Sequence, residues 1–291
     1  MYEKINEFCK TRNKGNVYSN GESPSPRVNF LIDLLLDNNI EFVLDKFPIE
    51  SRFSYNFERS PFWDRYKKKG NKRNYDDDFD FEKYFREKEK EKEKESKNYG
   101  FNLILKGNSD KMLVAHHDIS NANIDNANDN SASVINAISA KKLMPELNVV
   151  LLDGEECGGL GSKRCSAMIN EGYFDNIKWV LNLELTGKGG KYFFIGNYPG
   201  ELFNHIKSLF DCPVVDPPFN DSVTFRRNGI DSCVINTLPV TDTKSNVQWD
   251  ENTFLDYKMV FNCHLPSDNL ASISTTDMKE FVENVLVKIL K

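Results

Sequence analysis

Residues 112–118, Met-Leu-Val-Ala-His-His-Asp, place a short apolar run directly before three polar side chains of the kind that bind metals. The same order recurs in residues 149–156, Val-Val-Leu-Leu-Asp-Gly-Glu-Glu, and in residues 179–184, Trp-Val-Leu-Asn-Leu-Glu. Each apolar run is typical of a buried β-strand. In open α/β sheets, ligands bind beyond the carboxyl ends of the strands. The sequence therefore predicts that the three polar clusters converge at one edge of a sheet.

Strand-like and helix-like stretches alternate along most of the chain. The expected strands are 40–47, 101–105, 112–115, 149–152, 179–183, 192–195 and 233–235, and the expected helices are 24–37, 129–143, 161–170, 201–210 and 275–290. Such alternation is typical of a largely parallel sheet with helices on both faces. We therefore expect a three-layer α/β/α fold with a mostly parallel, mixed central sheet, formed by a single domain over residues 1–291.

Charge is distributed unevenly along the chain. The net charge of −6 argues against nucleic acid as the main partner. The segment 51–98 holds 15 Lys and Arg against 12 Asp and Glu residues, so the remainder of the chain carries −9. Aromatic residues accompany these charges, and they leave three interpretations open for the segment: a lid, an arm that docks a protein partner, or a partly disordered insertion.

The cysteines and the N-terminus indicate the compartment. The six cysteines include no Cys-x-x-Cys pair, which fits reduced thiols better than a disulfide framework. Residues 1–10 contain Glu3 and Glu7 and no apolar core, so we expect no signal peptide. The apolar run 30–36 is interrupted by Asp33 and is too short to span a bilayer. We therefore expect a cytoplasmic protein that does not enter a membrane.

The pair His116 and Asp118 has the spacing of a metal-binding imidazole held by a carboxylate. Residues two apart on an extended chain project to the same side, so Asp118 can orient the His116 ring and set its tautomer. The alternative is a structural histidine at the end of a strand. His117 projects to the opposite side, and we expect it to be structural.

Asp129 lies within Ala-Asn-Asp-Asn-Ser-Ala-Ser, residues 127–133, at the start of an expected helix. One interpretation is a helix N-cap, a position that Asp fills well. The other is a carboxylate that bridges two cations, with the flanking Asn and Ser side chains orienting it.

Glu155 and Glu156 follow a buried strand, and two adjacent carboxylates there would repel each other without a cation. The conflict disappears if one binds a metal and the other holds the attacking water. The alternative is an exposed acidic turn. His264 stands in a loop before the last helix, and three of the four histidines of the chain fall in these clusters.

Together these residues resemble the leucyl aminopeptidase-type di-zinc exopeptidases, the family that also contains glutamate carboxypeptidase II and glutaminyl cyclase. The matching stretches run in order from Phe101 to the C-terminal helix. They are 115–118, 127–132, 153–156 with Gly161-Ser162, 182–184, 220–230 and 264–268.

The resemblance implies a zinc-exopeptidase fold and a role for each residue. His116 and Glu184 would bind one zinc ion, Glu156 and His264 the other, and Asp129 both. Asp118 would support His116, Glu155 would be the general base, and Asp221 would lie near the substrate. Two zinc ions per chain would share a water that attacks the peptide bond of a peptide or small aminoacyl substrate with a free N-terminus.

The chain departs from the family pattern at three places. Family aminopeptidases usually have Asp where Glu184 stands, Ser222 replaces a usual His or Tyr, and segment 51–98 has no counterpart. Three alternatives to an aminopeptidase stay open: a glutaminyl cyclase-like acyltransferase, which keeps one zinc ion, a carboxypeptidase, and a non-enzymatic binding protein that docks through 51–98.

Overall fold

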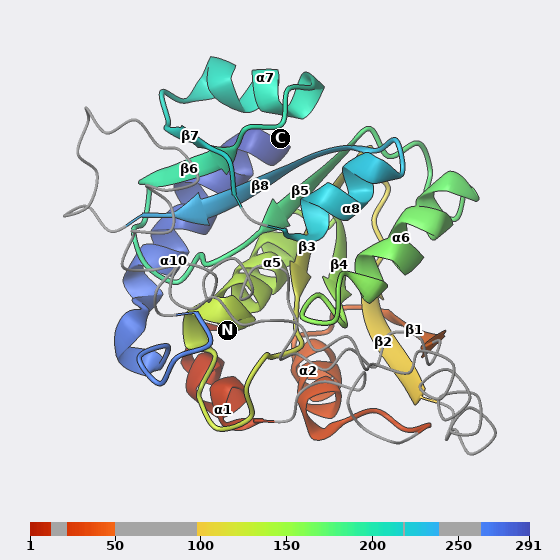
Figure 1. Cartoon of the computed structure of the whole chain (residues 1–291), viewed down its shortest axis with the longest axis vertical. Coiled ribbons are helices and arrows are strands. Elements are labelled where there is room, and N and C mark those ends of the chain that lie inside the picture. The colour runs from red at the N-terminus through yellow and green to blue at the C-terminus, as the bar shows by residue number, and fades with distance from the viewer. Residues whose placement is uncertain (13–21, 50–97, 218, 239–262) are drawn as a thin grey trace, which may run out of the picture.

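The computed structural model describes residues 1–12, 22–49, 98–217, 219–238 and 263–291, and its centre is an eight-stranded sheet (Figure 1). The strand order is β1-β2-β4-β3-β5-β8-β6-β7. The strands are β1 Val43–Ile49, β2 Asn98–Leu105, β3 Lys111–His116, β4 Asn148–Leu152, β5 Trp179–Leu183, β6 Phe193–Gly196, β7 Val214–Val215 and β8 Asp231–Thr237. The expected mostly parallel, mixed sheet is confirmed.

The middle of the sheet positions the polar clusters. Strands β4, β3, β5 and β8 are neighbours and run parallel, whereas β1, β2 and β6 add antiparallel pairings. In register, Val114 of β3 lies between Val150 of β4 and Asn182 of β5. Because these three strands are parallel and in register, their carboxyl ends open at the same edge of the sheet. This arrangement confirms the convergence expected from the sequence.

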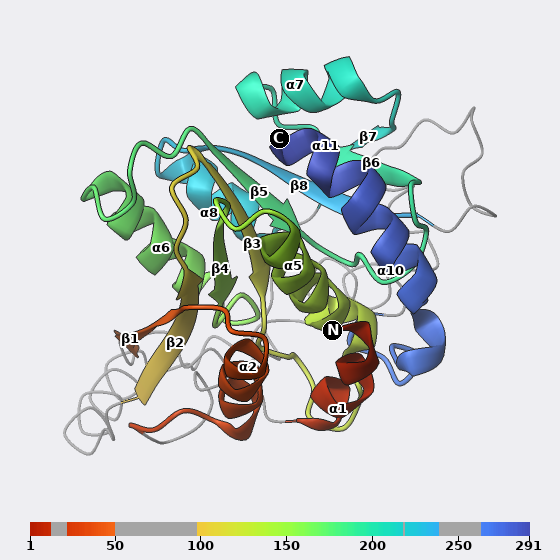
Figure 2. The same cartoon turned by 180° about the vertical axis from the view of Figure 1, so that it is seen from behind.

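Helices cover both faces of the sheet. They are α1 Ile5–Lys10, α2 Pro26–Asp37, α5 Ala132–Leu143, α6 Leu160–Asn170, α7 Glu201–Leu209, α8 Asp221–Arg227, and the C-terminal run α10 Thr275–Phe281, η9 Val282–Leu286 and α11 Val287–Leu290. One face carries α6 and α8, and the other carries α1, α2, α5, α7 and the C-terminal run (Figure 2).

Alternation along the strands explains the two cores. Leu113 and Ala115 of β3 pack in the larger core with α2 and α5, whereas Met112 and Val114 pack in the smaller core with α6. Successive side chains of a strand point to opposite faces, so a continuous apolar run buries both faces of a parallel sheet. The larger core includes residues from Ile5 to Leu290.

Two differences from the sequence prediction lie next to the polar clusters. Helix α5 begins at Ala132, because residues 127–131 form a separate π-helical turn, η5, in which Asp129 and Asn130 leave helical geometry. Helix α8 lies in a stretch where no helix was expected.

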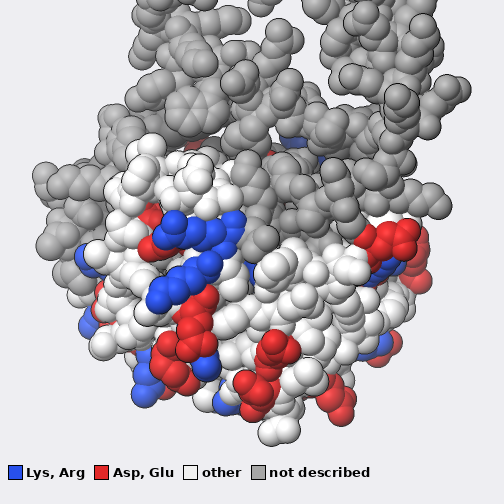
Figure 3. Space-filling model, turned by 90° about the horizontal axis from the view of Figure 1, so that it is seen from below, with Lys and Arg blue, Asp and Glu red and all other residues white. Residues whose placement is uncertain are grey.

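Segment 51–98 lies outside the described residues except for Asn98, so its role as a lid, docking arm or disordered insertion stays a prediction. In the part of the chain that the structure describes, no helix combines the length and apolarity needed to cross a membrane. On the face seen in Figure 3, Lys and Arg side chains lie next to Asp and Glu side chains, so its described part carries charges of both signs.

Candidate metal centre

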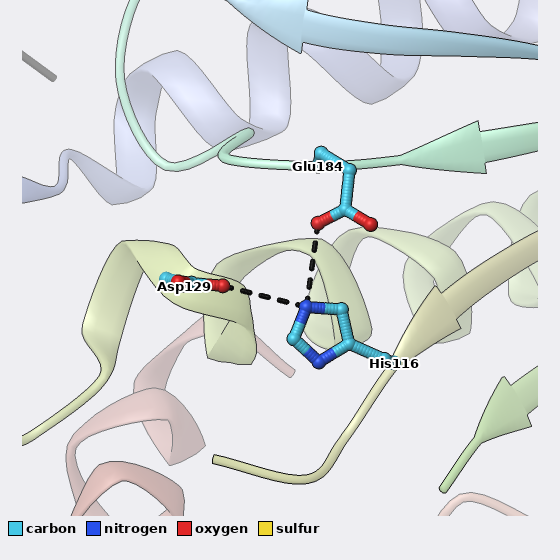
Figure 4. Close-up of side chains that lie close together, drawn as sticks. All are labelled: His116, Asp129 and Glu184. Carbon is cyan, nitrogen blue, oxygen red and sulfur yellow. Dashed lines mark ion pairs between the residues drawn. The ribbon is translucent and has the colours of Figure 1, made fainter. Parts of the chain in front are cut away.

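His116 ends β3 with its two ring nitrogens facing carboxylates on opposite sides. Its Nδ1 lies 3.3 Å from Oδ1 of Asp118. Its Nε2 lies 3.3 Å from Oδ1 of Asp129 and 3.3 Å from Oε2 of Glu184 (Figure 4). If Nδ1 carries the proton and donates it toward Asp118, Nε2 presents a lone pair to the space between Asp129 and Glu184. His116, Asp129 and Glu184 are all buried and form the first candidate metal triad.

A second triad shares Asp129 with the first. Nε2 of His264 lies 3.1 Å from Oε1 of Glu156 and 3.2 Å from Oδ2 of Asp129. In each triad the candidate ligand atoms lie within 4.8 Å of one another. Asp129 therefore offers one carboxylate oxygen to each triad.

The loop of Asp129 is held by Asp268. Oδ1 of Asp268 accepts a hydrogen bond from the backbone N–H of Asn128 at 2.7 Å, and Oδ2 accepts one from Asp129 at 3.1 Å. Asp129 itself has φ −109° and ψ 87°, and the N-cap of α5 is Ser131. The interpretation of Asp129 as a helix N-cap is therefore wrong, because its carboxylate is turned away from the helix toward the two histidines.

The turn after β4 separates the two glutamates. Asp118 accepts the backbone N–H groups of both Glu155 and Glu156, each at 3.1 Å. The Glu156 side chain is 5% exposed and faces His264, whereas half-buried Glu155 belongs to neither triad of described residues. The interpretation of Glu155 and Glu156 as an exposed acidic turn is therefore wrong, because neither residue is exposed.

Two amides hold the longer carboxylate of Glu184. Nδ2 of Asn130 donates to Oε2 at 3.0 Å, and Nδ2 of Asn182 donates to Oε1 at 3.1 Å. Asn130 also donates to the Leu183 carbonyl at 2.9 Å, which ties the Asp129 loop to the end of β5. Glu184 thus reaches His116 with both oxygens already bound to the chain.

The electrostatics of the cluster favour added positive charge. Burial opposes protonation of both histidines, but carboxylates of the triads outweigh it: Glu184 is foremost in raising the pKa of His116 well above its usual range, and Glu156 in raising that of His264 to about 11. Burial and the nearby Glu156 carboxylate raise the pKa of Glu155. The cluster therefore holds more negative charge than its own side chains balance, which suits divalent cations.

Two other residues singled out in the sequence lie close by. His117 is fully buried, points away from the triads and donates from Nε2 to the Phe101 carbonyl at 2.9 Å, so its expected structural role is confirmed. Asp221 begins α8 and is fully buried. Burial raises the pKa of Asp221 to about 7, with Glu184 adding to the effect.

The sequence predicted no role for Asp268 or Asn182, and it predicted that Asn130 orients Asp129, whereas the Asn130 amide holds Glu184 and the Leu183 carbonyl. All three residues lie in stretches that carry the family resemblance. Their position beside the candidate ligands was a usable signal. Their contacts with backbone amides and carboxylates depend on the conformation of the loops, so the spacing of residues in the sequence could not predict them.

The fold and the two triads define an α/β protein with a candidate two-metal centre at the carboxyl edge of its sheet. The sequence matches peptidase family M28 over residues 102–289. The chain belongs to this peptidase family, which confirms the resemblance to the di-zinc exopeptidases. No curated protein matches the chain.

Solved structures show the same fold at low sequence identity. The glutaminyl cyclase of Fimbriiglobus ruber aligns with a TM-score of 0.62 at 15% identity, over 99% of this chain and 93% of that one. The LapA aminopeptidase of Legionella pneumophila aligns with a TM-score of 0.61 at 10% identity, over 99% of this chain and 68% of LapA. The zinc aminopeptidase BSAP of Bacillus subtilis aligns with a TM-score of 0.50 at 16% identity, over 70% of this chain and 54% of BSAP. This chain therefore spans about half the length of BSAP.

Proposed function

We propose that this protein is a zinc-dependent aminopeptidase that hydrolyses the N-terminal peptide bond of its substrates. The observation that carries the proposal is the shared carboxylate: Asp129 directs Oδ1 toward His116 and Oδ2 toward His264. A carboxylate between two donor triads is the arrangement that two-metal hydrolases require. The match to peptidase family M28 supports the same function.

The donor set fits zinc. Imidazole nitrogens and carboxylate oxygens are ordinary zinc ligands, and catalytic zinc sites take three protein ligands and leave one position open. His116, Asp129 and Glu184 would hold one ion, and Asp129, Glu156 and His264 the other. Bound zinc would supply Lewis-acid chemistry, which lowers the pKa of a water and polarises the scissile carbonyl.

Glu155 is proposed as the general base. Because it stands beside the triads without joining them, its carboxylate is available to take the proton of the attacking water and to pass it to the leaving amine. Burial and neighbouring carboxylates raise its pKa, which makes it a better proton acceptor than an exposed glutamate. Asp118 is proposed to act through His116 by orienting its ring.

The charge around the triads favours the amino end of a peptide over the carboxyl end. The side chains of Asp118, Asp268, Asn130 and Asn182 contact residues of the triads, and each of them is acidic or neutral. A carboxypeptidase needs a cation for the substrate's terminal carboxylate. The proposed substrate is therefore a peptide or small aminoacyl compound with a free N-terminus.

A glutaminyl cyclase-like acyltransferase is the second candidate. The lengths of the proteins favour it. The alignment with the F. ruber cyclase covers 99% of this chain and 93% of the cyclase, whereas the alignment with BSAP covers only 54% of BSAP. A cyclase of that kind uses one zinc ion. The presence of both triads supports the aminopeptidase instead.

One experiment separates these functions. The purified full chain is analysed for bound metal and assayed with aminoacyl-nitroanilides, with the same compounds blocked at the amino group, and with a peptide that begins with glutamine. We expect about two zinc ions per chain and hydrolysis of the unblocked substrates alone.

The other outcomes have distinct meanings. One zinc ion with conversion of N-terminal glutamine to pyroglutamate and release of ammonia would identify the cyclase. Metal binding without turnover of any substrate would favour a binding protein. Full activity after thorough removal of metal would contradict the proposed chemistry.

A further inference from the structure

Arg27 is a buried cation in a part of the chain that lies outside the family match. It stands in the first turn of α2 and is fully buried, whereas the match to the peptidase family begins at residue 102. Its guanidinium lies over the ring of Phe8, with Cζ 3.8 Å from the ring centroid. An Arg side chain is rarely buried this deeply unless it makes specific interactions.

The guanidinium contacts both turns that carry candidate ligands. Its Nε donates to the carbonyl of His117, the residue between His116 and Asp118. Its Nη2 donates to Oγ of Ser131 at 2.8 Å, two residues after Asp129. Ser131 in turn donates to the carbonyl of Asn126 at 2.7 Å, at the start of the same loop.

The remaining donors anchor the guanidinium to the N-terminal helix. Nη1 donates to the carbonyl of Phe8 at 3.1 Å and to Oγ1 of Thr11 at 3.3 Å. A planar guanidinium with donors on three sides can join three segments, which a lysine ammonium on a flexible stem cannot do with the same geometry. Arg27 therefore connects α1, the turn after β3 and the loop before α5.

The charge of Arg27 suits this place. Burial lowers the pKa of the guanidinium to about 10, so it keeps its proton at neutral pH. The carboxylates of Asp118 and Asp153 lie near enough to stabilise that charge. The positive charge of Arg27 therefore lies close to the acidic residues of the candidate metal centre.

We propose that Arg27 is a positioning residue of the metal centre, which acts through the His117 carbonyl and the Ser131 hydroxyl to hold His116 and Asp129 at the separation needed for binding an ion. The N-terminal helices thus form part of the centre although they lie outside the family match. The inference rests on the proposed function, because it takes the triads to be metal ligands.

Lys141 provides a matched control. It is also a buried cation, and its Nζ donates to the carbonyls of Lys106, Pro145 and Leu147 at 3.0, 2.7 and 2.8 Å. It lies on α5, but ten residues beyond Ser131, which along a helix is about 15 Å. Its loss should destabilise the fold without reaching the triads.

The test compares Arg27→Met, Arg27→Lys, Ser131→Ala and Lys141→Met with the unchanged full chain. Zinc affinity is measured by competition with a chelating indicator, and melting temperature and amide hydrogen exchange of residues 112–131 are measured on metal-free protein. We expect Arg27→Met to weaken zinc binding about 10–100-fold, as is usual for residues that orient metal ligands. Arg27→Lys should recover part of the loss.

Ser131→Ala removes the hydrogen bond from Arg27 and the one to the Asn126 carbonyl but leaves the Arg27 side chain in place, so it tests the inference if the Arg27 variants do not fold. It should weaken zinc binding less than Arg27→Met and speed exchange in residues 126–131. Lys141→Met should lower the melting temperature and leave zinc affinity within about twofold, because effects of distant sites are independent.

Arg27→Met or Ser131→Ala with unchanged zinc affinity and unchanged local exchange would overturn the positioning role. An unchanged full chain that takes up no divalent ion would contradict the proposed function instead. The exchange of residues 112–131 in the metal-free variants would then decide whether Arg27 holds the two turns.

Discussion

Oδ1 of Asp118 accepts a hydrogen bond from the backbone N–H of Glu155 at 3.1 Å. The other oxygen accepts the N–H of Glu156, so one carboxylate at the end of β3 fixes the turn at the end of β4. The same carboxylate lies beside the His116 ring. Asp118 therefore links one candidate ligand directly to the turn that carries another, although it belongs to neither triad of described residues.

Replacing Asp118 by Asn should weaken the centre without removing a ligand. The amide keeps one acceptor oxygen, but its NH₂ group would oppose a backbone N–H, and the charge beside His116 is lost. We expect zinc affinity or kcat/KM to fall about 10–100-fold. Asp110→Asn, at the other end of β3 and partly exposed, is the control and should change neither value. Equal behaviour of the two variants would show that Asp118 has no orienting role.

Glu155→Gln should keep metal and lose turnover. Glutamine has the shape of glutamate but cannot accept the proton of water, so kcat should fall about 10²–10⁴-fold. Metal content and kcat are measured on the same sample, and Glu171→Gln, an exposed residue after α6, serves as the control. Turnover near that of the unchanged protein would remove Glu155 as the base.

Glu184→Asp should impair the centre, although Asp is the residue usual in the related aminopeptidases. The amides of Asn130 and Asn182 each donate to one oxygen of the longer side chain. A carboxylate that is one methylene shorter would no longer reach these amides and His116. We expect a loss of about 10–100-fold in zinc affinity, measured by chelator competition. The same substitution at exposed Glu146 should have no effect, and unchanged affinity in Glu184→Asp would show that the site adapts to either length.

Asp268→Asn should loosen the Asp129 loop. Asp268 accepts two adjacent backbone N–H groups, and an amide can accept only one of them. Because Asp129 serves both triads, we expect the affinity for both zinc ions to fall, which a two-site titration measures. A loss confined to one ion would contradict the shared role of Asp129.

Zinc affinity should rise with pH through the neutral range. The pKa of His264 is raised to about 11 and that of His116 is also raised, so both rings hold protons in metal-free protein at neutral pH. Zinc must displace these protons, and each one released changes the apparent affinity about tenfold per pH unit. Calorimetry in buffers of different ionisation enthalpy counts the protons. An affinity that stays constant from about pH 6 to pH 8 would show that zinc displaces no proton from the two histidines, contrary to this prediction.

Much of the fold could be read from the sequence because its signals are local. Apolar runs such as 112–115 and 149–152 define buried strands by their length and composition, and both appear in the structure as β3 and β4. The polar residues that follow them meet because parallel strands end at one edge. The resemblance to the di-zinc exopeptidases then identified His116, Asp129, Glu156, Glu184 and His264 as candidate ligands, because the matching stretches follow in the same order along the chain.

The contacts that orient these ligands depend on tertiary structure. Sequence spacing could not show that Asp268 binds the backbone of the Asp129 loop, or that Arg27 reaches the two turns from α2. Each of these contacts joins segments separated by about a hundred residues or more, and its direction is set by the backbone of irregular loops. The sequence by itself determined which side chains gather at the sheet edge, whereas the folded loops decided how each one points.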